Sequence, residues 1–538
     1  MTVSIAVPRL GWRHDRRLLR LGHGIRAHPE IVTALLCAVV LAIGQRGPDL
    51  PAQAYRVFLI RHHGLVAFDS HWYAGHALPG YSLLFPPLAA VVGARLVGAL
   101  SCIAATAAFT RLLRGSQRSG HDLAVLWFAV VSVVDLVVGR LPFALGLAAG
   151  IGSVVAARDH RRGWALVLAL ACGCASPLSG AFLLLAAAVW LPSAGWRTVL
   201  PLGAGAVGIG TAALFGEGGW FPFPATTLLV ILLLSVGGLV IVPRSSTLVR
   251  RGLLLYGVAS IALFPFQNPI GGNMVRLGAV FSGPLIAFEL WRSGRRRVLA
   301  VVAIPLLIWQ FAPLPNALSA GRDNPSSEAG YYTGLLSYLS AHGAETSRLE
   351  VPLTTGRWES DYLATGISLA RGWERQLDLG RNSVLYDKTL TAEAYHQWLL
   401  DTGVRWVALP DVSLDASEDG EQALLTGPTP SYLRPVWHDQ HWKLWEVRDA
   451  RPLVSGPAEL VRLGVSSIDL RATGAGTAVV LVRWTRFWRV TEGNACVAPT
   501  DDNWTQVILS EPGPVTLTAK VGLGSLAGAG GDGSCSDD

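Results

Sequence analysis

Apolar runs separated by short basic loops occupy most of residues 29–313 and constrain the fold of this chain more than any other feature. They cover residues 31–44, 81–113, 123–138, 142–157, 164–191, 199–215, 226–242, 253–264, 274–291 and 298–311. A helix needs roughly 20 apolar residues to cross a bilayer. Only 15% of the 538 residues are charged, against about 25% in an average soluble domain. The sequence therefore predicts a polytopic α-helical membrane domain over residues 29–313.

The basic residues give these runs an orientation. The runs at 81–113 and 164–191 are too long for one simple helix. We divide the first into an interfacial or re-entrant piece and a span starting near Ala94, and the second just before Pro177. With the basic arm of residues 1–28 in the cytoplasm, the positive-inside rule then predicts about eleven spans and an extracytoplasmic C-terminus. The net charge of +7 lies mainly in short loops, so it indicates orientation and not nucleic-acid binding.

The composition changes after the last apolar run, and the remaining chain is polar and interrupted by Pro and Gly. Helical patterns at 331–342 and 391–401 accompany strand patterns at 348–353, 404–409 and 442–447. They predict an extracytoplasmic α/β domain over residues 314–453. Residues 454–538 alternate apolar and polar positions in short runs before a Gly-rich tail, which predicts a β-sandwich. Cys496 and Cys535 both lie in this oxidising compartment, so we expect a disulfide between them.

Residues 45–80, which follow the first apolar run, carry an unusual density of carboxylates, imidazoles and aromatic rings. Asp49 is expected at headgroup depth, near the phosphate of a lipid-linked substrate. A carboxylate at that place could remove a proton from an acceptor hydroxyl, which makes Asp49 the first catalytic candidate and Asp69 the second. The alternative for each is an exposed turn residue, because Pro-Asp is common turn chemistry.

The other polar side chains of this loop are candidate substrate contacts. We assign that role to His62, His63, His71, Trp72 and Tyr73. Imidazoles beside carboxylates could instead bind a divalent cation. Their spacing matches no closed zinc site, so we expect no metal and no resident cofactor, and keep a divalent metal as the alternative.

Two arginines are expected where apolar runs meet the outer face. Arg140 lies at a helix junction, and Arg276 follows Asn273 at the start of the run at 274–291. A guanidinium slightly inside a bilayer is costly unless it is paired, and a lipid phosphate is a suitable partner. We therefore add Arg140, Asn273 and Arg276 to the substrate-binding candidates. The alternative is snorkelling or an ion pair with a buried carboxylate, for which Asp135 is placed to serve Arg140.

The order of these features resembles the GT-C superfamily of integral membrane glycosyltransferases, and more closely the YfhO-like membrane proteins of bacteria and actinobacteria. The matching motifs are HWYAG at 71–75, GYSLLFPP at 80–87, GRLPF at 139–143, ASPLSG at 175–180, NMVRL at 273–277 and GPL at 283–285. An acid early in the first outer loop and a terminal β-sandwich complete the pattern. Many relatives carry two acids close together in that loop, whereas Asp49 is followed by Leu50 and Pro51.

The resemblance implies a multi-pass plasma-membrane enzyme that works on the extracytoplasmic side. It implies a sugar donor on polyprenyl phosphate, an envelope glycan or lipid as acceptor, a metal-independent or metal-assisted transfer, and Asp49, or less directly Asp69, as the base. Two other functions remain open: a non-catalytic scaffold that binds a glycan or protein, and a transporter of a lipid-linked substrate. Transport favours polar residues along several span centres, whereas here they gather at one face.

Overall fold

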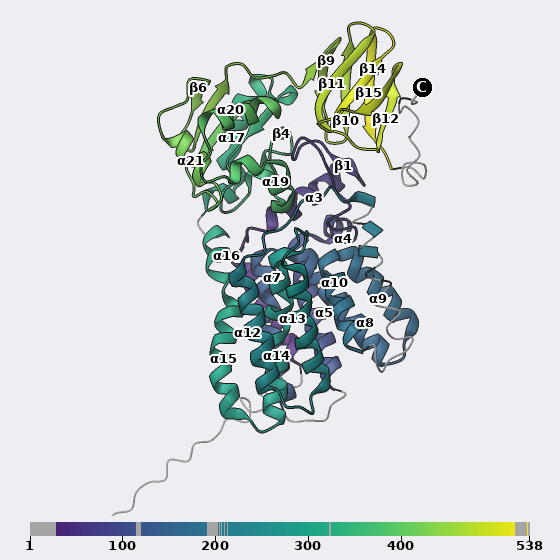
Figure 1. The fold of residues 1–538 in the computed structure, drawn as a ribbon, viewed down its shortest axis with the longest axis vertical. Helices are drawn as coiled ribbons and strands as arrows, with labels where there is room; N and C mark the ends of the chain where they lie inside the picture. The colour runs from purple at the N-terminus through teal and green to yellow at the C-terminus, as the bar shows by residue number, and fades with distance from the viewer. Residues whose placement is uncertain are drawn as a thin grey trace, which may run out of the picture.

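A helical bundle carries two smaller units at one end in the computed structural model (Figure 1). The structure describes residues 28–114, 120–190, 216–321, 324–521 and 535, together with single residues between 203 and 215. The expected basic arm at 1–28, apart from His28, lies outside the described residues. So do most of the expected span at 199–215 and most of the Gly-rich tail.

The bundle is built from apolar helices of unequal length. They are α2 (Pro29–Ala42), α5 (Ala94–Arg114), α6 (His121–Val131), α7 (Val133–Val138), α8 (Leu141–Arg158), α9 (Arg162–Ala175), α10 (Pro177–Trp190), α12 (Ala225–Ile241), α13 (Thr247–Leu263), α14 (Val275–Arg292), α15 (Arg296–Phe311) and α16 (Leu314–Gly321). Among the described residues, 5 helical stretches are long and apolar enough to cross a membrane: Ala94–Arg114, His121–Val138, Leu141–Arg158, Gly271–Arg292 and Arg296–Gly321. Shorter apolar helices, including α2, α9, α10 and α12, accompany them. The expected number of about eleven spans is therefore not confirmed, because several helices fall short of the length that a bilayer requires.

The structure divides both long apolar runs where the sequence indicated. The first becomes α4 (Phe85–Val92) and α5, with Gly93 between them. The second becomes α9 and α10, with Ser176 in extended conformation between them. Prolines occupy the first turns of α4 and α10, where the missing N–H costs no helical hydrogen bond.

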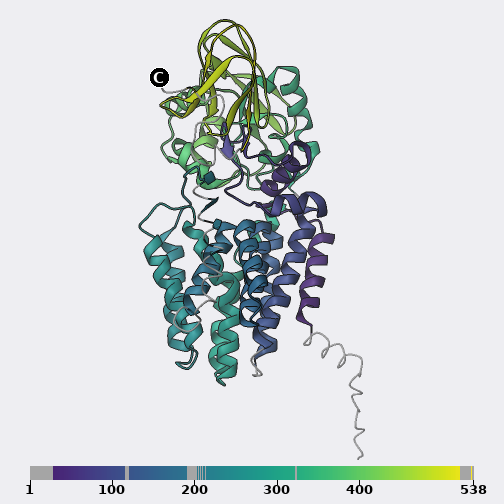
Figure 2. The same cartoon turned by 90° about the vertical axis from the view of Figure 1, so that its right-hand side faces the viewer.

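The helix next to the candidate catalytic residues was not predicted. Residues 45–80 were expected to be a loop, but they contain α3 (Leu50–His63) and a short hairpin of β1 (Phe68–Asp69) and β2 (His76–Ala77). Asp49 stands at the N-cap position and Pro51 in the first turn, which are ordinary start signals of a helix. In Figures 1 and 2, α3 lies between the bundle and the two smaller units, which we call the outer units because they lie at one end of the molecule.

The α/β unit contains a five-stranded sheet in the order β4–β3–β5–β7–β6. Its strands are β3 (Arg348–Glu350), β4 (Ser368–Leu369), β5 (Val404–Pro410), β6 (Leu433–His438) and β7 (Trp442–Val447). Its helices include α17 (Thr333–Ala341), α18 (Glu359–Tyr362), α19 (Arg375–Arg381), α20 (Ala392–Asp401) and α21 (Asp419–Thr426). The predicted helices at 331–342 and 391–401 correspond to α17 and α20, and the predicted strands to β3, β5 and β7.

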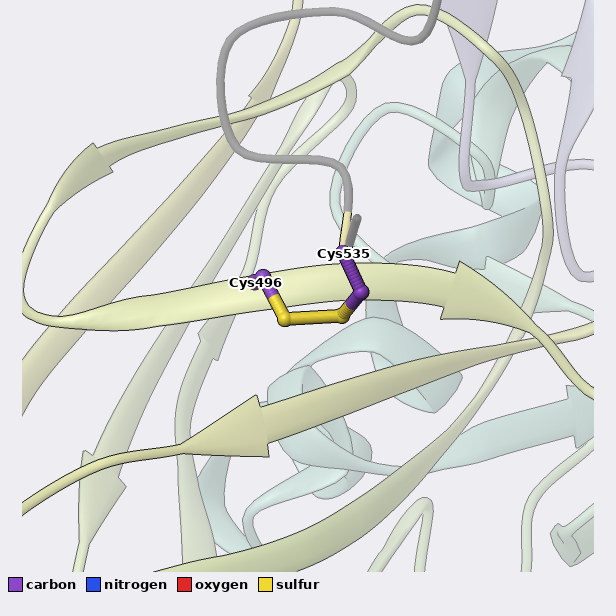
Figure 3. Close-up of a disulfide and its surroundings, with 2 residues drawn as sticks. All are labelled: Cys496 and Cys535. Atoms are coloured by element: carbon purple, nitrogen blue, oxygen red, sulfur yellow. A yellow bond between two sulfur atoms is a disulfide. The ribbon is translucent and has the colours of Figure 1, made fainter. Parts of the chain in front are cut away.

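The second outer unit consists of two four-stranded antiparallel sheets, β12–β15–β10–β9 and β13–β14–β11–β8. The strands are β8 (Val454–Ser455), β9 (Ala458–Leu463), β10 (Ser467–Ala472), β11 (Gly476–Arg483), β12 (Trp488–Glu492), β13 (Ala495–Pro499), β14 (Trp504–Leu509) and β15 (Gly513–Ala519). Inward residues such as Val480, Val507 and Leu517 are fully buried between the sheets. Cys496 on β13 forms a disulfide with Cys535 (Figure 3).

A buried ionic cluster lies inside the α/β unit. The Arg371 guanidinium lies 2.6 Å from Asp378 and 3.4 Å from Glu421, and also pairs with Glu418. Glu350 lies 3.7 Å away, and neither of its carboxylate oxygens has a hydrogen-bond partner. One cation does not compensate this many buried acids. Burial accordingly raises the pKa of Glu421 to about 8 and places the pKa of Glu350 well above its ordinary value.

This cluster predicts that the α/β unit loses stability as the pH rises. The folded Glu421 holds a proton between its ordinary pKa of 4.5 and its folded pKa of about 8. The stabilisation that this proton contributes is therefore fully present below the ordinary pKa. It is lost as the pH rises through the pKa of the folded state. Because Glu421→Gln removes this titration, the Tm of the variant should fall by several degrees less than that of the wild type between about pH 5 and pH 8. Thermal unfolding of the full chain measures this.

The matched control is Glu393→Gln, which changes an exposed acid on α20. It should follow the wild-type pH dependence. Equal slopes for Glu421→Gln and Glu393→Gln would contradict the assignment of the buried proton to this cluster.

Candidate functional site

Residues 68–77, which we call the docking loop, join the bundle to both outer units. Phe68 belongs to the apolar core of the β-sandwich. Trp72 and Tyr73 belong to a core that runs from α2 and α3 into the α/β unit. Trp72 Nε1 donates a hydrogen bond to Ser360 O at 2.8 Å, and the Tyr73 hydroxyl donates to Glu374 O at 2.9 Å. The loop thus inserts side chains into two separate hydrophobic cores.

Main-chain hydrogen bonds reinforce this contact on both sides. Leu369 N donates to His71 O, and Arg483 N donates to Ala74 O, each at 2.7 Å. Tyr73 and Ala74 adopt φ of 57° and 59°, a left-handed conformation that side chains other than glycine rarely take. Such strain persists only where the surroundings impose it. The outer units therefore hold the docking loop in one shape, and the loop fixes their position above the bundle.

Several expected substrate contacts serve this docking. His71 is buried, with Nδ1 2.7 Å from Ala364 O. Trp72 and Tyr73 are buried as described above. His62 and His63 lie exposed at the end of α3 and pack against Phe58. The structure therefore does not bring these five expected residues together around one surface, and a substrate-binding role for them stays a prediction.

Asp69 is also fully buried. Its carboxylate accepts hydrogen bonds from the Tyr55 hydroxyl at 3.0 Å and from His71 N at 2.9 Å. His76 Nδ1 lies 3.6 Å away, and burial raises the pKa of Asp69 to about 7. In this structure an acceptor hydroxyl has no access to the Asp69 carboxylate, whose contacts stabilise the docking loop.

A second polar group lies at the outer end of the bundle and is partly open to solvent. The Asp49 carboxylate lies 3.6 Å from Arg140 Nε, and these side chains are 19% and 21% exposed. The charges of Asp49, Arg140 and Asp135 all act on Arg276, which lies in the first turn of α14. Asn273 stands one turn earlier, in the 3-10 helix Gly271–Met274. The structure thus gathers Asp49, Arg140 and Arg276, which come from helix ends far apart in the sequence.

Close backbone packing sets the position of Asp49. Asp49 N donates a hydrogen bond to Val138 O at 3.0 Å. A Cβ on Gly47 would lie 2.3 Å from Val137 O, and a Cβ on Gly139 would lie 2.5 Å from Leu50 N. Only glycine at both positions lets the start of α3 lie directly against the junction of α7 and α8. This packing places the N-cap residue of α3 beside Arg140, the N-cap residue of α8.

Tyr81 connects this polar group to the α/β unit. Arg56 Cζ lies 4.0 Å above the Tyr81 ring, and Gln53 Nε2 donates to the Tyr81 hydroxyl at 3.2 Å. Arg56 also forms a buried ion pair with Glu374. Burial raises the pKa of Tyr81, and the charges of Arg56, Asp49, Arg276 and Glu374 also act on it. These groups therefore form one continuous electrostatic network.

The sequence contained a signal for part of this network. Asp49, Gln53 and Arg56 are spaced four and three residues apart, so they share one face once residues 50–63 are known to be helical. Glu374, by contrast, comes from a distant segment and had no local signal. Among the described residues, no group of three or more His, Cys, Asp or Glu side chains is placed to hold a metal ion.

Gly139→Ala tests the packing that positions Asp49. The new Cβ would meet the backbone of α3, and the residue would keep φ of +93°. We expect a loss of stability of about 2–4 kcal/mol, seen as a lower Tm of the full chain. Gly44→Ala is the matched control, because Gly44 has φ of +71° but a Cβ added there would meet nothing within 4 Å. It should cost only about 1 kcal/mol of backbone strain. Equal losses would show that the close approach is unimportant.

No family model and no curated protein matches this chain. One solved structure that resembles it is the cryo-EM structure of the arabinofuranosyltransferase AftD from mycobacteria, at 14% sequence identity and a TM-score of 0.47. The similarity covers 94% of this chain and 57% of the other, so this chain spans little more than half the length of that protein.

Proposed function

We propose that this chain is a GT-C-type membrane glycosyltransferase that takes its sugar from a polyprenyl-phosphate donor. The observation that carries the proposal is the placement of the Asp49 carboxylate beside the Arg140 guanidinium, with Arg276 close enough to interact electrostatically. A base and two cations at the partly open outer end of an apolar bundle suit a reaction between a lipid-linked phosphate and a hydroxyl acceptor. The GT-C-like order of motifs in the sequence supports the same reaction class.

In the proposed reaction, Asp49 accepts the proton of an acceptor hydroxyl as its oxygen bonds to the anomeric carbon. The bond between that carbon and the phosphate oxygen breaks, and polyprenyl phosphate leaves with the electron pair. Negative charge grows on the phosphate during this step, so fixed guanidiniums stabilise the transition state more than the ground state. Arg276 and Arg140 are the residues proposed to hold the phosphate, and Asn273 borders it.

The Asp49–Arg140 pair is compatible with this role. Their separation of 3.6 Å exceeds an ordinary hydrogen bond, and Arg140 Nε has no hydrogen-bond partner. A phosphate oxygen could therefore accept a hydrogen bond from the Arg140 guanidinium without breaking a strong existing bond. The Asp49 carboxylate would then be free to interact with the acceptor hydroxyl.

We further propose that both outer units lie on the extracytoplasmic side, with an envelope glycan or lipid as acceptor. The disulfide between Cys496 and Cys535 supports this orientation, because such bonds persist in oxidising compartments. The α/β unit contacts the segment next to Asp49 directly, since Trp373 Nε1 donates to Pro48 O at 2.9 Å. This contact supports the proposal that the α/β unit borders the acceptor.

A non-catalytic scaffold is the second candidate. The observation that favours it is the use of Asp69, His71, Trp72 and Tyr73 in docking, which leaves fewer loop residues for a substrate. Under this alternative the Asp49–Arg140 pair is structural, and the outer units bind a glycan or protein without chemistry.

Substitution of Asp49 separates the two candidates. Asp49→Asn keeps the size but removes the base, so sugar transfer should fall about 100-fold or more while donor binding persists. Arg276→Gln should weaken donor binding as well as turnover, because it removes a phosphate partner. The assay follows transfer from a panel of polyprenyl-phosphate sugars to envelope acceptors in membranes that contain the full chain.

Two further acids serve as controls. Asp122→Asn changes an exposed acid at the start of α6 and should leave transfer unchanged. Asp69→Asn should lower the Tm, because Asp69 supports the docking loop. If Asp69→Asn abolishes transfer without loss of stability while Asp49→Asn remains active, Asp69 is the base. If the wild-type chain transfers no sugar from the panel beyond the background of membranes without it, the scaffold is favoured. Unchanged transfer by Asp49→Asn, Arg276→Gln and Asp69→Asn would contradict the roles proposed for these residues.

A further inference from the structure

A cavity of about 560 Å³ lies where residues 214–217 meet the β-sandwich. It shares no lining residue with the group around Asp49. Arg381 at the end of α19 lines it together with Glu217, Arg483, Trp484, Arg486 and Phe487. Its volume lies within the usual range for small-molecule sites, about 300–1,000 Å³.

Positive charge exceeds negative charge in this cavity. Glu217 is the lining carboxylate, and it lies 2.7 Å from Arg381 Nη2. It also accepts a hydrogen bond from Ala77 N at 2.6 Å. Arg483 and Arg486 make no ion pair within 4 Å among the described residues. The carboxylates of Glu217 and Asp502 both lie close enough to act on Arg483, and Asp502 does not line the cavity.

The two unpaired guanidiniums are held in place without using all their donors. Arg483 Cζ lies 3.9 Å from the centre of the Trp504 ring, and its Nη1 donates to Asp502 O at 3.1 Å. Its Nε is buried and has no hydrogen-bond partner. Arg486 is exposed, and its Nη2 donates to Leu214 O. A buried donor without a partner is uncommon in folded proteins, so the Arg483 guanidinium keeps hydrogen-bonding capacity that the described residues do not use.

Aromatic rings form the rest of the lining. Phe487 stacks on Phe215 with ring centres 5.5 Å apart, and Trp484 lies beside them in the lining. Apolar ring faces beside guanidinium forks suit a ligand with a phosphate at one end and a carbon skeleton at the other. A bare ion would leave the rings without a contact.

We propose that this cavity binds the phosphate group of a glycerol or sugar phosphate, carried either by a membrane lipid headgroup or by a soluble molecule. Arg483 and Arg486 donate to the phosphate oxygens, and Trp484 and Phe487 pack against the attached polyol. This site is independent of the proposed glycosyl transfer, because none of its residues belongs to the group around Asp49.

Binding to the purified full chain tests this site. The lipid probe is phosphatidylglycerol in nanodiscs, with bound lipid counted by native mass spectrometry against phosphatidylcholine. The soluble probe is glycerol 3-phosphate, titrated by calorimetry. We expect the wild type to bind at least one probe, more weakly as salt is raised. The double variant Arg483→Gln, Arg486→Gln should lose about tenfold or more in affinity.

The matched control is Arg471→Gln on β10, an exposed arginine of the same sandwich outside the cavity. It should bind both probes like the wild type.

If the double variant fails to fold, Arg486→Gln alone replaces it, because this residue is exposed. Arg486→Lys should retain part of the affinity. If the wild type binds phosphatidylglycerol alone, the ligand is a lipid headgroup. If it binds glycerol 3-phosphate, the ligand is a soluble molecule. Binding of neither probe, or equal binding by the double variant and the control, would overturn the proposal.

Discussion

The insertion of the docking loop into two hydrophobic cores is the contact on which the rest of this structure depends. Phe68 packs in the β-sandwich, while Trp72 and Tyr73 pack in the core shared by the bundle and the α/β unit. Burial of a large side chain contributes about 1.5–3 kcal/mol, so three aromatic anchors can hold the outer units in one place. The buried ion pair of Arg56 and Glu374 also fixes the orientation of the α/β unit relative to α3.

The same attachment shapes the group around Asp49. The chain enters the docking loop directly after α3, and α3 begins at Asp49. Fixing the far end of α3 against the outer units, and its start against Gly139, leaves Asp49 little freedom to move. A carboxylate held in this way beside Arg140 is preorganised for proton transfer, since little reorganisation is then needed when substrate binds. The contacts of the docking loop therefore also help to fix the position of the proposed catalytic group.

The sequence predicted the fold better than it predicted the roles of residues. Strands β5 and β7 match the predicted strands at 404–409 and 442–447, and the breaks before α5 and α10 lie at Ala94 and Pro177, as predicted. These features depend on local patterns, which periodicity and turn chemistry report directly. Helix α3 was missed because its apolar pattern is weak and buried polar residues such as Gln53 and Arg56 interrupt it.

Residue roles depended on tertiary contacts that a single sequence does not contain. His71, Trp72 and Tyr73 have the chemistry of a substrate site, yet burial in the α/β unit turns them into anchors. Asp49 and Asp69 have the same chemistry, and only their burial separates them: 19% exposure for Asp49 against 0% for Asp69. Partners such as Glu374 lie hundreds of residues from α3, so no local pattern indicated them.

A cryo-EM structure of the chain in nanodiscs with bound polyprenyl phosphate tests whether Asp49, Arg140 and Arg276 form the reaction site. We expect the phosphate within about 3 Å of the Arg140 and Arg276 guanidiniums, with the Asp49 carboxylate turned away from Arg140 and open to an acceptor. A phosphate bound elsewhere on the molecule, with Asp49 still paired to Arg140, would contradict it.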